Sequence, residues 1–281
     1  CSPSEERFKS TADKQQKVPV FLIILCHRVT PSLASYMIAY HKASGSVEMM
    51  KNYLWYDFYS GEINLVELKD FLLKIYNLLY DEYGSQGWWP AEDWFEVIVG
   101  AILTQNTSWK NVERAISNLR NNRVLKPEKL YALPLEQLAA LIKPAGFYNL
   151  KAQRLKNMLK FLKQYDFDFM KLSSNITREV LLEIKGVGKE TADSILLYAF
   201  NVPVFVVDNY TKRIFQRLGV LSNKDDYDSI QKLFYIIPPD LQMYKEYHAL
   251  IVKHAKNMCT KHKPSCDQCA LENFCKYLSR F

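Results

Sequence analysis

The chain has 281 residues, of which 48% are hydrophobic and 24% are charged. This composition suits one large or two smaller globular domains with a buried core, and no apolar run approaches the ~20 residues that a helix needs to cross a bilayer. The formal net charge of +7 and the pI of about 8.9 fit a nucleic-acid partner without establishing one.

The first part of the chain, residues 1–64, is expected to be a peripheral or partly disordered extension. The apolar run Val18–Leu25 follows a polar, basic start, so a secretory signal is the alternative interpretation. That run is barely long enough for a signal, however, and no small-residue cleavage site follows it cleanly. The sequence begins with Cys1, and Met49 offers a natural translation start. We therefore expect residues 1–48 to be dispensable for folding and activity.

From residue 65 onward the sequence predicts one helix after another. The segment 65–84 places its leucines and isoleucine on one stripe and ends at a glycine, and the segment 93–105 is apolar enough to be a buried helix. The segment 150–165 is expected to turn its lysines and arginine outward and, inward, Leu150, Leu155, Met158, Leu159 and Leu162. Shorter amphipathic helices are expected at 111–120, 135–142, 209–219, 227–237 and 244–259.

One segment, Val202–Val207, has the composition of a strand, but it is too short to build a sheet. The predicted fold class is therefore all-α, with two helical lobes.

A pair of glycines, Gly186 and Gly188, separates expected helices at 177–184 and 190–200. Glycine tolerates positive φ and lets another backbone come close, and Val187 between the two glycines can fill the seam between the helices. Unpaired N–H groups at the start of the second helix would then form an anion site, to which Lys185 and Lys189 add charge. The alternative is an ordinary helix–turn–helix connection, because glycine often ends a helix.

Four of the six cysteines fall in the last 23 residues with the spacing C-x6-C-x2-C-x5-C, whereas Cys1 and Cys26 are isolated. A disulfide framework would be spread through the chain, so the clustering favours a metal or cluster site. Zinc and a [4Fe–4S] cluster both bind four thiolates, and the spacing leaves both open. The four residues are Cys259, Cys266, Cys269 and Cys275.

Five features together resemble one known family: "LLEIKGVGKETA", "VVDNYTKRIFQRLG", "GAILTQNTSW", "GFYNLKAQRL" and the cysteine array. From about Leu65 to Phe281 the chain resembles the helix-hairpin-helix DNA glycosylases of the endonuclease III superfamily. The resemblance implies a six-helix barrel lobe over 88–206, with the hairpin at about 177–200, and a second lobe made from 65–87 and 207–281. It also implies a cytoplasmic monomer, associated with the nucleoid in a prokaryote, that has no membrane partner and acts on double-stranded DNA containing a damaged base.

The same resemblance assigns DNA contacts and selects the [4Fe–4S] cluster for the four cysteines. Gln105 and Asn106 fall where the family inserts a polar side chain into the gap left by a flipped nucleotide, and we favour Asn106. The remaining expected contacts bind backbone phosphate without reading sequence. They are the hairpin residues Lys185, Gly186, Val187, Gly188, Lys189 and Thr191, and Lys261 and Lys263 in the basic loop between the cysteines.

Two acidic residues are the expected catalytic groups. Asp208 precedes a helix and would be a good N-cap, and it also matches the catalytic aspartate of the family. A carboxylate there would stabilise positive charge on the sugar as the base–sugar bond breaks. Glu190 stands where bifunctional members carry a Schiff-base lysine, and Lys189 is turned about 100° away from that position. The resemblance therefore implies a monofunctional DNA N-glycosylase with weak or absent lyase activity, unless Glu190 is simply a solvated residue that favours the helix dipole.

An aromatic pocket is expected around Trp88, Trp89, Pro90 and Trp109, while Trp94 is expected in the core. Aromatic faces stack on a flipped base and attract a cationic one. "WWP", "GAILTQNT" and the glutamate in the lysine position most resemble the 3-methyladenine glycosylases of the endonuclease III type, which implies an alkylated purine substrate. Some members of that branch lack the cysteines, and this departure leaves a glycosylase for another lesion, or an inactive DNA-binding protein, as alternatives.

Overall fold

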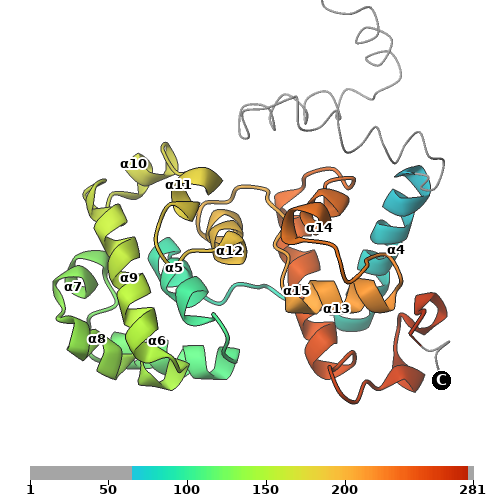
Figure 1. The fold of residues 1–281 in the computed structure, drawn as a ribbon, viewed down its shortest axis with the longest axis horizontal. Helices are drawn as coiled ribbons and strands as arrows, with labels where there is room; N and C mark the ends of the chain where they lie inside the picture. The colour runs from blue at the N-terminus through green and yellow to red at the C-terminus, as the bar shows by residue number, and fades with distance from the viewer. Residues whose placement is uncertain (1–64, 278–281) are drawn as a thin grey trace, which may run out of the picture. The chain divides into compact units, whose positions relative to one another are not determined.

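The computed structural model describes residues 65–277 (Figure 1). The expectations for residues 1–64, including the dispensability of 1–48, lie outside the described residues. Residues 65–277 belong to one compact unit. None of the helices in this part of the chain is long and apolar enough to span a membrane.

The described residues form helices and no strand, which confirms the all-α fold class. The strand-like segment Val202–Val207 is an irregular connection between helices α12 and α13. Its last four residues are buried, so their apolar composition serves core packing and not sheet formation.

The first group of helices surrounds the glycine pair (green to yellow in Figure 1). Helices α5 and α12 contact each other extensively, and nearly every residue of both is buried. Helices α6 and α9 pack against α5, and α11 packs against α12, so α5 and α12 form the centre of this group. The helices are α5 (Trp94–Leu103), α6 (Trp109–Asn121), α7 (Pro127–Ala132), α8 (Leu135–Leu141), α9 (Tyr148–Lys163), α10 (Phe169–Ser173), α11 (Arg178–Leu182) and α12 (Lys189–Ala199), with the short 3₁₀ turn η1 (Lys143–Ala145).

The second group joins the start and the end of the described chain. Helix α15 packs against both α4 and α13, and the Tyr247 hydroxyl on α15 donates to the carbonyl oxygen of Leu72 on α4 at 2.8 Å. Stacked rings of Phe205 and Phe234, with centroids 3.8 Å apart, fill its interior. The elements are α4 (Leu65–Tyr83), α13 (Asn209–Arg217), α14 (Tyr227–Phe234) and α15 (Leu241–Asn257), followed by the 3₁₀ turns η2 (Cys266–Gln268) and η3 (Glu272–Phe274).

Helix starts are set by side-chain caps. At six helices the N-cap side chain accepts a hydrogen bond from the backbone N–H three residues later, which satisfies one of the free donors of the first turn. These caps are Asp93, Asp168, Thr177, Asp208, Asp226 and Asp240.

Two expectations for helix α9 were wrong. Lys151, expected to face outward, is fully buried, and its Nζ donates to the carbonyl oxygens of Leu103 at 2.8 Å and Ala145 at 2.7 Å. Leu150, expected to face inward, is 50% exposed. The carbonyl at the end of α5 needs a donor in the interior. Lys151 supplies that donor, and the rotation of about 100° per residue then turns Leu150 toward solvent.

Candidate active site

The glycine pair forms a tight turn between α11 and α12. The backbone N–H of Val187 donates to the carbonyl oxygen of Ile184 at 2.9 Å, and the Val187 side chain is buried in the seam as expected. Gly186 has a φ of +102°, and a Cβ there would lie 2.4 Å from Cγ of Arg154. Gly188 is the N-cap of α12 and offers no side-chain acceptor, and a Cβ on it would meet nothing within 4 Å. The start of α12 is therefore open to an approaching anion.

Gln105 binds the turn from the neighbouring loop. Its Nε2 donates to the carbonyl oxygen of Gly186 at 3.1 Å and to Oγ1 of Thr191 at 2.9 Å, and its Oε1 accepts from Arg154. Both polar ends of Gln105 are thus engaged. Asn106 is exposed and has a left-handed φ of +53°, so of the two residues it is the one free to reach outward.

A second exposed side chain belongs to a loop that neighbours the one with Asn106. Phe147, at the start of α9, is 69% exposed and has a φ of +45°. The two loops are adjacent because Lys151 bonds to both Leu103, three residues before Asn106, and Ala145, two residues before Phe147. From the sequence, this loop served only as part of the family resemblance, and Phe147 was given no contact role. A non-glycine residue with positive φ is uncommon, which makes this exposed ring a candidate contact residue.

Asp208 is buried at the start of α13, with 8% of its surface exposed. Its Oδ1 accepts from the backbone N–H of Thr211 at 2.7 Å and from the Thr211 hydroxyl at 2.9 Å, and its Oδ2 lies 3.6 Å from Nε2 of His248. Burial raises the pKa of Asp208, but the His248 imidazole and the two Thr211 donors lower it by more, so the net pKa lies below the ordinary value. Asp208 is therefore an ionised carboxylate at neutral pH.

Glu190 lies in the first turn of α12 and is electrostatically coupled to Asp208. Although part of its side chain is exposed, protein atoms crowd the carboxylate, and this desolvation together with the charge of Asp208 raises the pKa to about 7. His248 and Lys212 oppose the shift. Glu190, in the first turn of α12, therefore titrates near neutral pH, whereas Asp208, at the start of α13, stays ionised.

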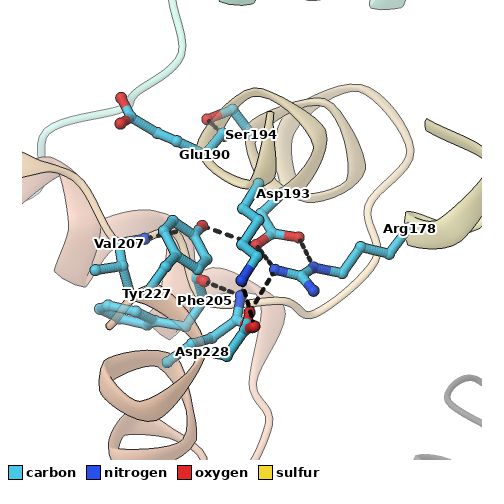
Figure 2. A network of polar contacts seen from close by, with 10 residues as sticks. Arg178, Glu190, Asp193, Ser194, Phe205, Val207, Tyr227 and Asp228 are labelled. Atoms are coloured by element: carbon cyan, nitrogen blue, oxygen red, sulfur yellow. Dashed lines mark hydrogen bonds and ion pairs between the residues drawn. The ribbon is translucent and has the colours of Figure 1, made fainter. Parts of the chain in front are cut away.

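Lys189 is held in an ion-pair network away from Glu190. Its Nζ lies 2.5 Å from Oδ2 of Asp228, whose Oδ1 accepts from Arg178 at 3.1 Å. Arg178 also binds the buried Asp193 at 2.7 Å, and Figure 2 shows Glu190 extending away from this network. The contact of Lys189 with phosphate stays a prediction. To make it, the Lys189 amine would share its charge with Asp228 on α14, with which it is already paired.

Three tryptophans pack against one another at the other end of α12. Ring centroids of Trp88 and Trp109 are 4.8 Å apart and those of Trp89 and Trp109 are 5.2 Å apart, all partly buried. Trp89 also contacts Tyr198 on α12 at 5.1 Å. The indole nitrogens of Trp89 and Trp109 are buried without a hydrogen-bond partner in the described part of the chain. Pro90 is exposed, and Trp94 packs with Phe95, Phe169 and Phe200. The structure therefore gathers Trp88, Trp89 and Trp109, which were expected to form a pocket, into one cluster. Trp94, which was expected in the core, lies outside this cluster.

The four C-terminal cysteines line one hollow, whose empty volume of about 290 Å³ includes space open to solvent. Arg217 donates from Nη1 to Sγ of Cys259 at 3.0 Å. Among residues 65–277, no three histidine, cysteine or carboxylate side chains converge closely enough to bind a single metal ion. Four thiols around one hollow supply the donor set that both a [4Fe–4S] cluster and a zinc ion use. Lys261 and Lys263 are exposed in the loop between these cysteines.

Comparison with known proteins decides what kind of molecule carries this arrangement. A family model described as "HhH-GPD superfamily base excision DNA repair protein" matches residues 99–239. A "Putative DNA repair glycosylase MJ1434" of Methanocaldococcus jannaschii is 54% identical over 212 residues, which cover 73% of this chain and 96% of the relative. The chain belongs to the HhH-GPD superfamily. It is accordingly a DNA glycosylase of base excision repair, with DNA as its partner, and the expected family resemblance is confirmed.

Two further members of the superfamily place the chain more closely. The solved structure of 3-methyladenine DNA glycosylase from H. pylori bound to 1,N6-ethenoadenine is 31% identical, with a TM-score of 0.59, and covers 69% of this chain and 98% of its own. Endonuclease III of Sulfolobus acidocaldarius is 30% identical and covers 65% of this chain and 82% of its own. A non-covalent endonuclease III–DNA complex, at 22% identity and a TM-score of 0.67, supports the fold.

The two hairpin glycines give a matched pair of variants. In this HhH-GPD protein we expect Gly186→Ala to lower the free energy of unfolding by about 1–3 kcal/mol, because alanine is strained at a φ of +102° and its methyl group collides with Arg154. Gly188→Ala should change stability by less than about 0.5 kcal/mol but weaken duplex binding by about tenfold, because its methyl group fills the open space before α12. Thermal unfolding and fluorescence anisotropy measure the two effects. Unchanged DNA affinity in Gly188→Ala would argue against phosphate binding at this turn.

Proposed function

We propose that this protein is a monofunctional glycosylase, which hydrolyses the N-glycosidic bond of a damaged base with water and leaves an abasic site. The observation that carries the proposal is the pair Asp208 and Glu190, whose pKa values are displaced in opposite directions. Carboxyl groups whose environments separate their pKa values can take different roles in acid–base chemistry.

Asp208 is assigned the electrostatic role. Departure of the base leaves positive charge on the sugar, and an ionised carboxylate in a buried site stabilises that charge more strongly than it would in water. Thr211 holds one oxygen of Asp208 with two hydrogen bonds, so the carboxylate needs little reorganisation during the reaction.

Glu190 is assigned the role of general base toward the attacking water. A base with a pKa of about 7 is half ionised at neutral pH and is still basic enough to accept a proton. Glutamate cannot form a Schiff base with the sugar, and the adjacent amine of Lys189 is paired with Asp228. Another amine near the site is that of Lys212, which lies close enough to Glu190 to lower the pKa of this carboxyl group.

The proposed substrate class is an alkylated purine such as 3-methyladenine. The tryptophan cluster offers aromatic faces that attract a cationic base, and a base that already carries positive charge can leave without a general acid, which agrees with Glu190 acting as a base. The H. pylori relative, a 3-methyladenine glycosylase seen with 1,N6-ethenoadenine, supports this class.

A [4Fe–4S] cluster is the proposed cofactor, held by Cys259, Cys266, Cys269 and Cys275. Its assigned contribution is to staple the C-terminal loop to α13, where Arg217 already binds the Cys259 sulfur and two backbone carbonyls of the loop. The resemblance of the cysteine array to that of the endonuclease III superfamily supports the choice of cluster over zinc.

A panel of duplexes, each with one lesion, tests activity and substrate together. We expect release of 3-methyladenine, no strand cleavage, and no covalent adduct on borohydride treatment, because no lysine acts as nucleophile. Asp208→Asn should bind the duplex but lose nearly all release. Release of uracil, mismatched thymine or an oxidised base instead would overturn the alkylpurine assignment alone, and an efficient borohydride adduct would overturn the monofunctional mechanism.

The pH dependence tests the role of Glu190. Only its ionised form is a base, so the single-turnover rate of the wild-type protein should fall about tenfold per pH unit below pH ~7 and level off above it. Glu190→Gln should be about 10²–10⁴-fold slower at the plateau and lose this limb. If the variant kept both the rate and the limb, Glu190 would not be the base.

The cofactor proposal is checked by elemental analysis of protein purified without oxygen. About four irons per chain with matching inorganic sulfide are expected. Stoichiometric zinc without iron would instead identify a structural zinc site.

A further inference from the structure

A buried chain of three side chains leads from α12 to the catalytic carboxylate. The Tyr198 hydroxyl on α12 lies 2.7 Å from Nδ1 of His248 on α15, and Nε2 of His248 lies 3.6 Å from Oδ2 of Asp208 at the start of α13. The exposed fractions of these residues are 8%, 5% and 8%. Residues from three helices thus meet at Asp208, and the proposed function uses neither Tyr198 nor His248.

The hydrogen-bond partners determine which imidazole nitrogen carries a proton. If Tyr198 donates to Nδ1, a neutral imidazole carries its proton on Nε2. If Tyr198 instead donates to the Lys245 carbonyl oxygen at 3.3 Å, it must accept from Nδ1–H. A neutral ring would then direct a lone pair at the Asp208 carboxylate, so this second arrangement requires the imidazolium. In both acceptable arrangements an N–H on Nε2 faces Asp208.

This N–H is the one donor of the ring without a partner. Nε2 of His248 is buried and makes no hydrogen bond within the described residues, because 3.6 Å is too long for one. On Asp208, Oδ1 already accepts two bonds from Thr211, whereas Oδ2 faces His248. Catalytic hydrogen bonds are often long in the free enzyme and shorten in the complex with substrate.

We propose that Tyr198 and His248 are positioning residues that hold an N–H against Oδ2 of Asp208 and so keep this carboxylate ionised and in one orientation toward the sugar. Tyr198 fixes the ring through Nδ1. It also packs against Trp89, which connects this pair to the aromatic cluster. The proposal rests on the proposed function, since it assigns Asp208 the role given there.

Other charged groups also act on this site. Glu190 on α12 is coupled to Asp208, to His248 and to Lys212 on α13, and Tyr210 on α13 is coupled to Asp208 and Glu190. Lys256 on α15 is coupled to Asp208, and Glu246 on α15 acts on Tyr198. All of them remain in place in the variants below. Because His248 also acts on Glu190, the titration of Asp208 itself, and not the rate profile alone, reports on the pair.

Two substitutions of His248 separate positioning from packing. Asparagine can place its amide near the Nδ1 position and keep the contact to Tyr198, but it cannot reach Asp208, whereas glutamine can extend an N–H to the Nε2 position. In His248→Asn we expect the single-turnover rate on the best lesion of the panel to fall about 10²-fold, with duplex affinity unchanged within about threefold. In His248→Gln at least a tenfold part of that loss should return.

The pH profile and a direct titration provide readouts that a packing role would not move. His248 also lowers the pKa of Glu190, so the acid limb of the rate should move toward higher pH in His248→Asn for that reason. The direct readout of the pair is ¹³C NMR of the aspartate carboxyl groups, which should show a higher pKa for Asp208. Tyr198→Phe should produce a smaller change in the same direction. The matched control is Tyr247→Phe, which removes a buried hydroxyl on α15 that donates to the Leu72 carbonyl oxygen. This variant should change neither the rate profile nor the pKa of Asp208.

The outcomes distinguish the two proposals. Equal loss of rate in His248→Asn and His248→Gln with an unmoved Asp208 pKa would overturn the positioning role, as would full activity in His248→Asn. Failure of the wild-type protein to release any base would overturn the proposed function, and the NMR titration would still decide whether His248 holds Asp208 ionised. If the asparagine variant failed to fold, Tyr198→Phe and its titration would decide.

Discussion

The orientation of helix α12 depends on one buried carboxylate. Asp193 is fully buried, and it accepts from both Nε and Nη2 of Arg178, from the Tyr227 hydroxyl and from Nε2 of Gln231, at 2.7 to 3.2 Å (Figure 2). Removing Arg178 would leave this buried carboxylate without its charged partner, which costs about 3–5 kcal/mol. Burial nevertheless raises the pKa of Asp193, so the network only partly offsets the loss of water. Since the donors come from α11 and α14, they fix α12 against two other helices and prevent its rotation.

Everything in the site follows from that fixed rotation. Successive residues of a helix are turned by about 100°, so holding Asp193 toward α14 directs Glu190 toward Asp208 and places Tyr198, two turns away from Glu190, against His248. The glycine turn that begins the helix is fixed with it. A single helix thereby carries the turn for which phosphate binding is proposed, the carboxyl group that titrates near neutral pH and the tyrosine of the proposed positioning pair.

Local patterns in the sequence predicted the helices. The burial and pairing of individual charged side chains could not be predicted, because they depend on contacts between residues far apart in the chain. The apolar stripe of α4, the aspartate cap of α13 and the cysteine spacing depend on neighbours within a few residues, and each could be predicted. The burial of Lys151 depends on carbonyls 48 and 6 residues away, and the pairing of Lys189 depends on Asp228, 39 residues away. Tyr198 and His248 lie 50 residues apart. A histidine on an apolar helix face is usually a core residue, so only its position opposite Asp208 indicates another role.

Helix α13 connects the cysteine loop to the Asp208 carboxylate. Asp208 begins this helix, and Arg217 ends it by binding the Cys259 sulfur and the carbonyl oxygens of Thr260 and Lys261, while the Cys275 thiol faces the Arg217 carbonyl. Nine helical residues form a stiff rod of about 13 Å. Because this helix is stiff, a shift of the cysteine loop at its C-terminal end would also move the Asp208 carboxylate at its N-terminal end. The cysteine loop is therefore connected mechanically to the carboxylate for which a catalytic role is proposed, in addition to any contact that its lysines make with DNA.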